Sequence, residues 1–378
     1  MRLVFLSHDS SCTGGAQKCL LDLLKGIKQN YPDWQLYMVF PAQGDFVDIC
    51  SHYLDGYKIL RLKWWLVDGR YLITKKKKLS YIYKLLRSSF KLLRYLQQIK
   101  PDCVITNTIV VPHMALSSRL LGIKHYWFIH EIPDVTWGDK CFIFKSQFIF
   151  KLIDKFSTKV LVPSEYAKRY YQNMILRDKL NIITQAVELS PEVNVNQHRE
   201  SCARYTILLV GAFDSNKGQM ELLQAIKRIV DVGRDIYCYL VGPDIGLKSV
   251  CQEYIRMNKL ERNVEIVPFT NQISLYYYMT DVLLVCSAIE SFGRVAVEAQ
   301  RCGLPVILSD VGANPERIEN GVNGLLYKKG DITDLIEKIE ILRDVRVRKK
   351  FSEKIDLDML GKYSIDCFAS DFVKLVQV

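Results

Sequence analysis

The sequence lacks the features that would place the chain across a membrane, in an oxidising compartment or on a nucleic acid. No apolar run reaches the roughly 18 residues of a membrane-spanning helix. The 11 cysteines are scattered, odd in number and without the paired spacing of metal sites, so we expect reduced thiols. There is no GxGxxG fingerprint, no Walker lysine pattern and no RNA- or DNA-binding motif. Since the first residues already form a strand pattern, we expect no cleavable signal and a soluble or peripheral intracellular protein.

The length and the charge distribution divide the chain into two parts. A chain of 378 residues with 49% hydrophobic residues is long enough for two domains. The net charge of +11 is uneven, with +13 over residues 1–188 and −2 over 189–378. We therefore expect only the first half to meet an extended anionic surface. Anionic lipid and a phosphate-bearing acceptor both qualify, and nucleic acid is less favoured because no binding motif is present.

Both halves alternate short apolar runs with helical patterns, which is typical of an α/β fold with parallel sheets. In the first half the predicted strands are 3–7, 34–40, 57–63, 102–106, 124–129, 160–163 and 181–183, and the helices are 18–28, 79–99, 111–121, 141–156 and one from 165. In the second half the strands are 205–210, 236–241, 264–267, 282–285 and 306–309, and the helices are 220–230, 247–257, 272–279, 332–342 and 364–376. Residues 186–203 read as a linker.

The stretch from Val282 to Pro305 carries the strongest functional pattern, a buried strand, a short loop and a helix. Parallel sheets bind ligands at the carboxyl ends of their strands. Gly293 lets the backbone approach a ligand, and the free amides near Arg294 suit a phosphate. Glu290 and Glu298 can accept hydrogen bonds from sugar or ribose hydroxyls. Taken alone, an ordinary helix with a solvated glutamate explains the pattern equally well.

Other candidate residues follow predicted strands. Gly15 lies in a tight strand-to-helix turn, where amides can approach a phosphate or sugar, although a plain turn is an equal alternative. His130 stands at the carboxyl end of strand 124–129, where it can bind a hydroxyl or transfer a proton, and His8 is a weaker candidate of the same kind. Lys217 beside Gly218 places a cation at a helix start, which suits a diphosphate, and the alternative is a solvated loop lysine.

A basic amphipathic helix over 79–99 follows the lysine run 75–78. Its apolar residues are predicted to form one stripe, and its cations continue the basic character; these are Ile82, Leu85, Leu86, Leu92, Leu93 and Leu96, with Lys84, Arg87, Lys91 and Arg94. Such a helix can lie on an anionic membrane or cover a sheet with a solvated basic face. The aromatic-rich stretch 141–156 is either core or a second membrane-touching surface.

Three stretches in order, VPSEYAK, VGAFDSNKG and ESFGRVAVEAQRCGLPVILSDVGANPERIENGVNGLLY, resemble retaining glycosyltransferases of family 4. The last contains Glu290 and Glu298 as an E-x7-E motif, and the resemblance covers essentially the whole chain. It implies the GT-B architecture, in which two Rossmann-like domains face each other across a cleft. Residues 1–185 would form the acceptor domain and 204–361 the donor domain, joined by the linker 186–203. The helix 362–378 would pack back on the first domain.

The resemblance also implies roles for individual residues. Lys217 would contact the diphosphate of a nucleotide-sugar donor, Glu290 the transferred sugar and Glu298 the ribose. The implied donor-binding set is Gly15, Lys217, Glu290, Ser291, Phe292, Gly293, Arg294 and Glu298, and the implied catalytic set is Glu290, His130 and Lys217. Neither a metal nor another cofactor is expected, and Asp356 and Asp358 are interpreted as surface aspartates. Many family members carry an arginine at the position of Ala212, so here Lys217 works with another cation, such as Arg294, or phosphate binding is weaker.

The expected function is therefore retaining transfer of a hexosyl group from a nucleotide sugar to a lipid-linked or membrane-proximal acceptor, as in surface polysaccharide or glycolipid biosynthesis. We expect a cytoplasmic protein, peripheral on the inner face of the membrane, with its basic first half toward anionic lipid. Two alternatives stay open. One is a non-catalytic nucleotide-sugar-binding partner of a membrane complex, and the other is a nucleotide-sugar epimerase of the same fold.

Overall fold

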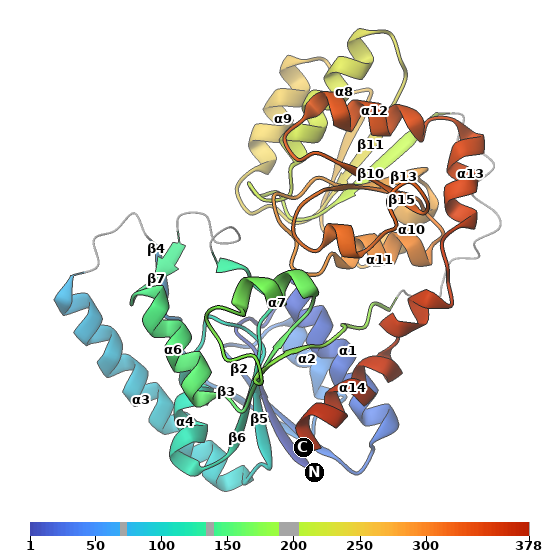
Figure 1. Ribbon diagram of the computed structural model, residues 1–378. Helices are drawn as coiled ribbons and strands as arrows, with labels where there is room; N and C mark the ends of the chain where they lie inside the picture. Colours follow the sequence, from blue (N-terminus) through green and yellow to red (C-terminus); the bar gives the residue numbers. More distant parts are fainter. Residues whose placement is uncertain (69–73, 134–139, 189–203, 378) are drawn as a thin grey trace. The chain divides into compact units, whose positions relative to one another are not determined.

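The chain consists of two compact α/β units, each built on one parallel sheet (Figure 1). This computed structural model describes residues 1–68, 74–133, 140–188 and 204–377. Unit 1 comprises Met1–Ala186 and Lys362–Val378, and unit 2 comprises Val187–Gly361. Most of the linker predicted over 186–203 lies outside the described residues.

Unit 1 contains a seven-stranded sheet in the order β3-β2-β1-β5-β6-β8-β9, with every neighbouring pair parallel. Its strands are β1 (Arg2–Leu6), β2 (Gln35–Phe40), β3 (Gly56–Ile59), β5 (Cys103–Thr106), β6 (Lys124–Phe128), β8 (Lys159–Val162) and β9 (Leu180–Ile182). The helices are α1 (Gly15–Asn30), α2 (Asp45–Ser51), α3 (Lys75–Ile99), α4 (His113–Leu121), α6 (Ser146–Phe156) and α7 (Glu165–Tyr171). Short apolar runs form the central strands because both faces of a parallel sheet are covered.

The last helix, α14 (Ile365–Gln377), belongs to unit 1 although it is far from it in sequence. It packs on α1, and Phe368 and Phe372 are fully buried in the same core as β1 and β2. Gly26 of α1 is the point of closest approach, because a Cβ there would lie 2.6 Å from Cγ2 of Ile365 and 2.7 Å from its carbonyl oxygen. The final helix therefore completes the core of the first sheet.

Unit 2 contains a six-stranded parallel sheet in the order β12-β11-β10-β13-β14-β15. Its strands are β10 (Thr206–Val210), β11 (Tyr237–Val241), β12 (Val264–Val267), β13 (Val282–Val285), β14 (Val306–Ser309) and β15 (Gly324–Tyr327). The helices are α8 (Gln219–Asp231), α9 (Lys248–Met257), α10 (Ile273–Tyr278), α11 (Arg294–Arg301), α12 (Ile332–Ile341) and α13 (Val345–Glu353), with 3-10 turns at Asn314–Glu316 and Met359–Tyr363. Separate apolar cores cover its two faces.

Several local predictions were wrong. The lysine run does not precede α3 but forms its first turn, because Thr74 caps the helix by accepting a hydrogen bond from the amide of Lys77. Residues 141–142 are not helical, because β7 (Lys140–Phe142) pairs antiparallel with β4 (Leu66–Asp68). This strand pair is held by Trp65, whose indole stacks on Trp127 and donates to the carbonyl of Ile109. Tertiary contacts that no local pattern encodes decide these segments.

The apolar residues of α3 that were predicted to form one stripe fall on a buried and an exposed face. Leu92 and Leu96 are buried, whereas Ile82 and Leu86 are exposed. At 100° per residue, Leu92 and Leu96 lie on one face of the helix, and Ile82 and Leu86 lie on the adjacent face. Only the face of Leu92 and Leu96 packs against the rest of unit 1.

We expect Gly26→Ala to destabilise unit 1 by about 1–3 kcal/mol through overpacking against α14. In an open helix interior the same change would stabilise by roughly 1 kcal/mol. Urea unfolding of the full chain measures the difference, with Lys25→Ala as a near-neutral control in the same helix. A stabilised Gly26→Ala variant would show that α14 does not pack against this position.

Candidate functional site

The candidate site of unit 2 lies where its sheet reverses strand order. The chain passes from β10 to β11 and β12 on one side and returns through β13 to the other side of β10. The loops that follow β10 and β13 therefore meet at the carboxyl edge, which is where open parallel sheets bind ligands. The first of these loops carries Lys217 and the second carries Glu290.

Lys217 and Glu290 form a direct ion pair. Nζ of Lys217 lies 2.6 Å from Oε1 of Glu290, and the two side chains are 26% and 13% exposed. Burial would lower the pKa of Lys217, but the charge and hydrogen bond of Glu290 outweigh it and raise that pKa above 10.5. Lys217 is therefore a cation at neutral pH. In the described part of the chain no residue donates a hydrogen bond to Oε2 of Glu290, which leaves this oxygen as an acceptor for a hydroxyl.

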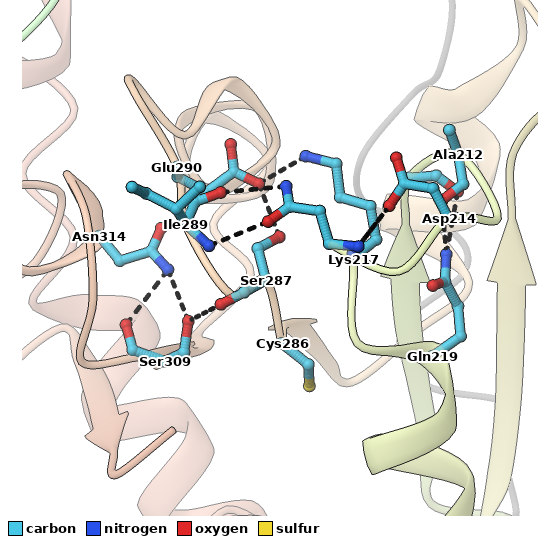
Figure 2. Close-up of polar contacts among 12 residues, drawn as sticks. Ala212, Asp214, Lys217, Gln219, Cys286, Ser287, Ile289, Glu290, Ser309 and Asn314 are labelled. Carbon is cyan, nitrogen blue, oxygen red and sulfur yellow. Dashed lines mark hydrogen bonds and ion pairs between the residues drawn. The ribbon is translucent and has the colours of Figure 1, made fainter. Parts of the chain in front are cut away.

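A chain of polar contacts fixes Glu290 from a third loop (Figure 2). The hydroxyl of Ser287 donates to Oε1 of Glu290 at 2.7 Å, and the hydroxyl of Ser309 donates to the carbonyl of Ser287 at 2.8 Å. Asn314 in turn donates to the carbonyl and hydroxyl oxygens of Ser309. The loops after β10, β13 and β14 are thus joined through buried or half-buried groups.

Backbone contacts hold the same loops at close range. Asn216 accepts a hydrogen bond from the amide of Ile289 at 3.0 Å, and its own side-chain amide donates to the carbonyl of Ile289. Gly218 has φ of +73°, and a Cβ there would lie 2.0 Å from the carbonyl oxygen of Cys286. Gly312 has φ of +65°, and a Cβ there would lie 2.4 Å from the carbonyl oxygen of Glu290. Only glycine fits these two positions without moving the site.

The start of α11 presents its first amides beside Gly293, which has φ of +83°. The ring of Phe292 is buried under the guanidinium of Arg317 at 4.7 Å, so its side chain supports the loop from inside. Glu298 is only 7% exposed and accepts a 2.7 Å hydrogen bond from the hydroxyl of Tyr277. Its other oxygen lies 3.9 Å from Nε of Arg294, one turn earlier on the helix.

Ala212 brings no charge to the site. Its carbonyl oxygen accepts a 2.8 Å hydrogen bond from the fully buried side chain of Gln219, which fixes the loop (Figure 2). Arg294, the replacement cation suggested by the sequence, is only 12% exposed and is directed to Glu298. The cation that meets Glu290 is therefore Lys217.

In unit 1 His130 is held by two neutral side chains. Its Nε2 lies 2.8 Å from the side-chain oxygen of Asn107, and the amide nitrogen of Gln185 lies 3.0 Å from its Nδ1. This arrangement fits a neutral ring protonated at Nε2. The neighbouring Glu131 accepts hydrogen bonds from the hydroxyl of Thr108 and from the amide of Ile109, so its carboxylate fixes the loop after β5.

Gly15 is the first residue of α1, and Asn107 donates to the carbonyl of the next residue, Ala16, at 2.9 Å. His8 follows β1, and burial lowers the pKa of its ring against the opposing charges of Glu131 and Asp9. These groups lie at the carboxyl edge of the first sheet, where strand order reverses between β1 and β5.

The structure joins some of the predicted residues and leaves others in separate contacts. Lys217 forms an ion pair with Glu290, and Arg294 forms one with Glu298, whereas Gly15 and His130 belong to unit 1. The sequence reading missed supporting residues at strand ends; these are Asn107, Gln185, Asn216, Ser287, Ser309 and Asn314. For Asn107, Ser287 and Ser309 the signal was a polar side chain at or just after the end of a buried strand, whereas Gln185, Asn216 and Asn314 lie further along their loops.

Within the described ranges, no group of three or more His, Cys, Asp or Glu side chains is placed to hold a metal ion. Of the helices that the structure describes, none has the length and apolar character needed to cross a membrane.

Residues 192–356, less than half of the chain, match the family model described as glycosyl transferases group 1. An uncharacterized glycosyltransferase of Methanocaldococcus jannaschii is 30% identical over 242 residues, which are 63% of this chain and 64% of that protein. The capsular polysaccharide biosynthesis glycosyltransferase CapM of Staphylococcus aureus is 31% identical over 165 residues, 40% and 43% of the two chains. The lipopolysaccharide 1,2-N-acetylglucosaminetransferase of Salmonella typhimurium is 25% identical over 230 residues, 57% and 60%. The chain thus spans 43–64% of the length of these curated relatives.

Solved structures match the whole chain. HepE of Anabaena in complex with UDP and glucose has a TM-score of 0.77 at 18% identity, covering 100% of this chain and 99% of that one. A glycosyltransferase of Rickettsia africae has a TM-score of 0.77 at 19% identity, covering 100% and 97%. Likeness at this identity shows the fold, and it confirms the predicted GT-B class with two Rossmann-like domains. The protein therefore has the GT-B fold, and its second unit is similar to the group 1 glycosyl transferases.

We expect Gly312→Ala to displace Glu290 and to lower the free energy of unfolding by more than the roughly 1 kcal/mol that a positive φ alone costs. Gly321→Ala is the matched control, because Gly321 also has positive φ (+82°) but open space around its Cβ. Urea unfolding of both variants measures the difference. Equal losses would show that the loop of Gly312 does not press on Glu290.

The ion pair predicts a pH dependence in the alkaline range. Because Glu290 raises the pKa of Lys217, the pair stabilises the fold fully below pH 10.5 and loses its effect as the pH rises through the folded-state pKa. The difference in unfolding free energy between wild type and Glu290→Gln should be constant from about pH 7 to 9 and shrink above that range. A difference independent of pH up to complete lysine deprotonation would contradict the pairing.

Proposed function

We propose that this protein is a glycosyltransferase that moves a sugar from a nucleotide-diphosphate donor to an acceptor. The supporting observation is the ion pair of Lys217 and Glu290 at the strand-order reversal of unit 2, inside a segment of the group 1 type. Relatives named for capsular polysaccharide and lipopolysaccharide synthesis favour a role in surface polysaccharide or glycolipid biosynthesis. The UDP and glucose held by HepE favour UDP-sugars among the donors to be tried.

The proposed chemistry follows from the charges. Breaking the bond between sugar and diphosphate places negative charge on the departing phosphate. A charged Lys217 and the first amides of α11 are suited to stabilise it in a fixed, half-buried setting. Oε2 of Glu290 accepts a hydrogen bond from a hydroxyl of the transferred sugar, and this contact orients the sugar. We propose retention of configuration, as in family 4, through front-face displacement assisted by the departing phosphate, with neither metal nor other cofactor.

The remaining donor contacts are also proposals. The amides of Ser291, Phe292, Gly293 and Arg294 would receive phosphate or sugar, and Oε1 of Glu298 the ribose. Gly15 and His130 would act from unit 1, and a hydroxyl that bonds to the ring of His130 would take the place of Asn107 or Gln185. We further propose a lipid-linked or membrane-proximal acceptor and a peripheral position on the cytoplasmic face of the membrane, supported by the charge of +13 over residues 1–188.

Ala212 favours a second candidate function, a non-catalytic nucleotide-sugar-binding partner of a membrane complex. Without a second cation in this loop, charge stabilisation on the departing phosphate is weaker. Donor binding by calorimetry with no turnover on any acceptor would support this candidate. Conversion of donor to its epimer without acceptor would instead indicate an epimerase.

In a hydrolysis and transfer assay over UDP- and GDP-sugars, we expect Lys217→Ala and Glu290→Ala each to lower kcat by about 10²–10³-fold, since each removes a group that contacts the reacting sugar diphosphate. Lys227→Ala is the control, because it removes a lysine of α8 whose partner is Asp231 on the same helix. Equal activity in wild type and both site variants would rule out these roles.

A further inference from the structure

Helix α3 exposes a continuous apolar stripe on the side that does not pack against unit 1. Leu79 is 68% exposed, Tyr83 65%, Leu86 61% and Phe90 54%, and Ile82 lies beside them. Spacings of three, four, seven and eleven residues put them on one helix face. In Figure 1 α3 runs along the outside of unit 1, packed against α4 on its other side. A monomeric soluble protein rarely leaves such a contiguous stripe uncovered.

Cations run alongside this stripe, and α3 itself carries no acidic residue. The sequence of α3 contains no Asp or Glu, and its cations are Lys75, Lys76, Lys77, Lys78, Lys84, Arg87, Lys91 and Arg94. Arg94 lies over the ring of Phe90 at 4.5 Å, so the two rows adjoin. Lys84, Arg87, Lys91 and Arg94 form no salt bridge with any residue in the described ranges. An apolar stripe next to unpaired cations is complementary to an anionic bilayer, which offers hydrocarbon and phosphate at one boundary.

The same helix forms one wall of a cavity of about 830 Å³ within unit 1. The cavity lies at the carboxyl ends of β1 and β2, and its cationic lining residues are Arg61, Lys63, Lys77 and Lys84, against a single carboxylate, Asp68. Arg61 and Lys63 pair with no carboxylate that the structure describes. Two buried polar atoms in the walls, Nδ1 of His8 and the hydroxyl of Tyr81, have no hydrogen-bond partner. Trp64 adds an aromatic face, so the lining suits a phosphate with a sugar or apolar group attached.

We propose that α3 rests on an anionic bilayer by its apolar stripe and that the adjoining cavity receives the phosphate-bearing head of a membrane-anchored acceptor. Lys77 and Lys84 connect the two surfaces, because they line the cavity and belong to the helix that carries the stripe. This inference rests on the proposed function only in treating the bound molecule as the acceptor of a sugar. Both binding surfaces that it invokes belong to unit 1.

The first test is flotation of the full chain with vesicles of phosphatidylcholine, with and without phosphatidylglycerol. Leu86→Gln with Phe90→Gln should lower binding to the anionic vesicles by about tenfold or more. The matched control is Val250→Gln with Met257→Gln, which removes two exposed apolar side chains from α9 of unit 2. No loss in the α3 variant, or the same loss in both, would overturn the docking surface.

The charge is tested in the same assay. Arg87→Gln with Lys91→Gln should lower binding to anionic vesicles by about fivefold per charge removed. High salt should also lower the binding of the wild type to these vesicles. Lys349→Gln with Lys350→Gln on α13 of unit 2 removes the same charge elsewhere and should leave binding unchanged. Equal binding of wild type to neutral and anionic vesicles would contradict the proposal.

The cavity is tested with geranylgeranyl diphosphate in phosphatidylcholine vesicles and with pyrophosphate in solution. Arg61→Gln with Lys63→Gln should weaken retention on the diphosphate vesicles by about tenfold, while binding to phosphatidylglycerol vesicles persists. If pyrophosphate alone binds the cavity as tightly and the lipid diphosphate is not retained, the cavity takes a free phosphate and the membrane-anchored source is wrong. Retention that is unaffected by the variant would overturn the cavity assignment.

Donor hydrolysis without acceptor separates this inference from the proposed function. The α3 variants and the controls on α9 and α13 should leave that rate unchanged in solution, because none of these side chains lies among the contacts of Lys217 and Glu290. Vesicle docking without any donor turnover would leave the docking intact and overturn the proposed function. Turnover without docking would leave the proposed function intact and overturn the docking surface. It would then point to a protein or nucleic acid as the occupant of the stripe.

Discussion

Glu290 and Lys217 form an ion pair in a half-buried position, and the carboxyl edge of unit 2 is arranged to keep it there. Charges removed from water are costly unless each is paired and hydrogen-bonded. Ser287 supplies a second hydrogen bond to Glu290, and Ser309 and Asn314 hold Ser287 in turn. Because the strand order reverses between β10 and β13, the two loops meet without either having to cross the sheet.

The carboxyl edges of the two parallel sheets carry different kinds of polar groups. Unit 2 holds opposite charges, whereas unit 1 surrounds His130 with the neutral side chains of Asn107 and Gln185. Both ring nitrogens of His130 are engaged by these side chains, whereas Lys217 stays charged and is suited to bind a phosphate. The positive charge of the first half is concentrated elsewhere, on α3 and on the short stretch that contains Arg61 and Lys63.

The two parallel α/β halves could be predicted because their strands are short, continuous apolar runs such as Val282–Val285, which are typical of parallel sheets. The GT-B class was implied by the resemblance of the motif stretches to family 4. The proximity of Lys217 and Glu290 could also be expected, since both follow strands whose ends share an edge. The ends of helices and the pairing of strands far apart in sequence were harder to predict. The antiparallel pair of β4 and β7 joins segments about 70 residues apart, and the cap at Thr74 places the start of α3 in the lysine run.

Periodicity in the chain was sufficient to establish two alternating α/β halves, because apolar spacing records whether a residue is covered on one face or on both. It could not say which face of α3 is covered, because an exposed leucine and a buried leucine have the same letter and the same spacing. Only the packing of α3 against α4 left Leu86 and Phe90 in solvent while burying Leu92 and Leu96. In the same way, only folding showed that Glu290 is held by Ser287 and that Gly312 is required beside it.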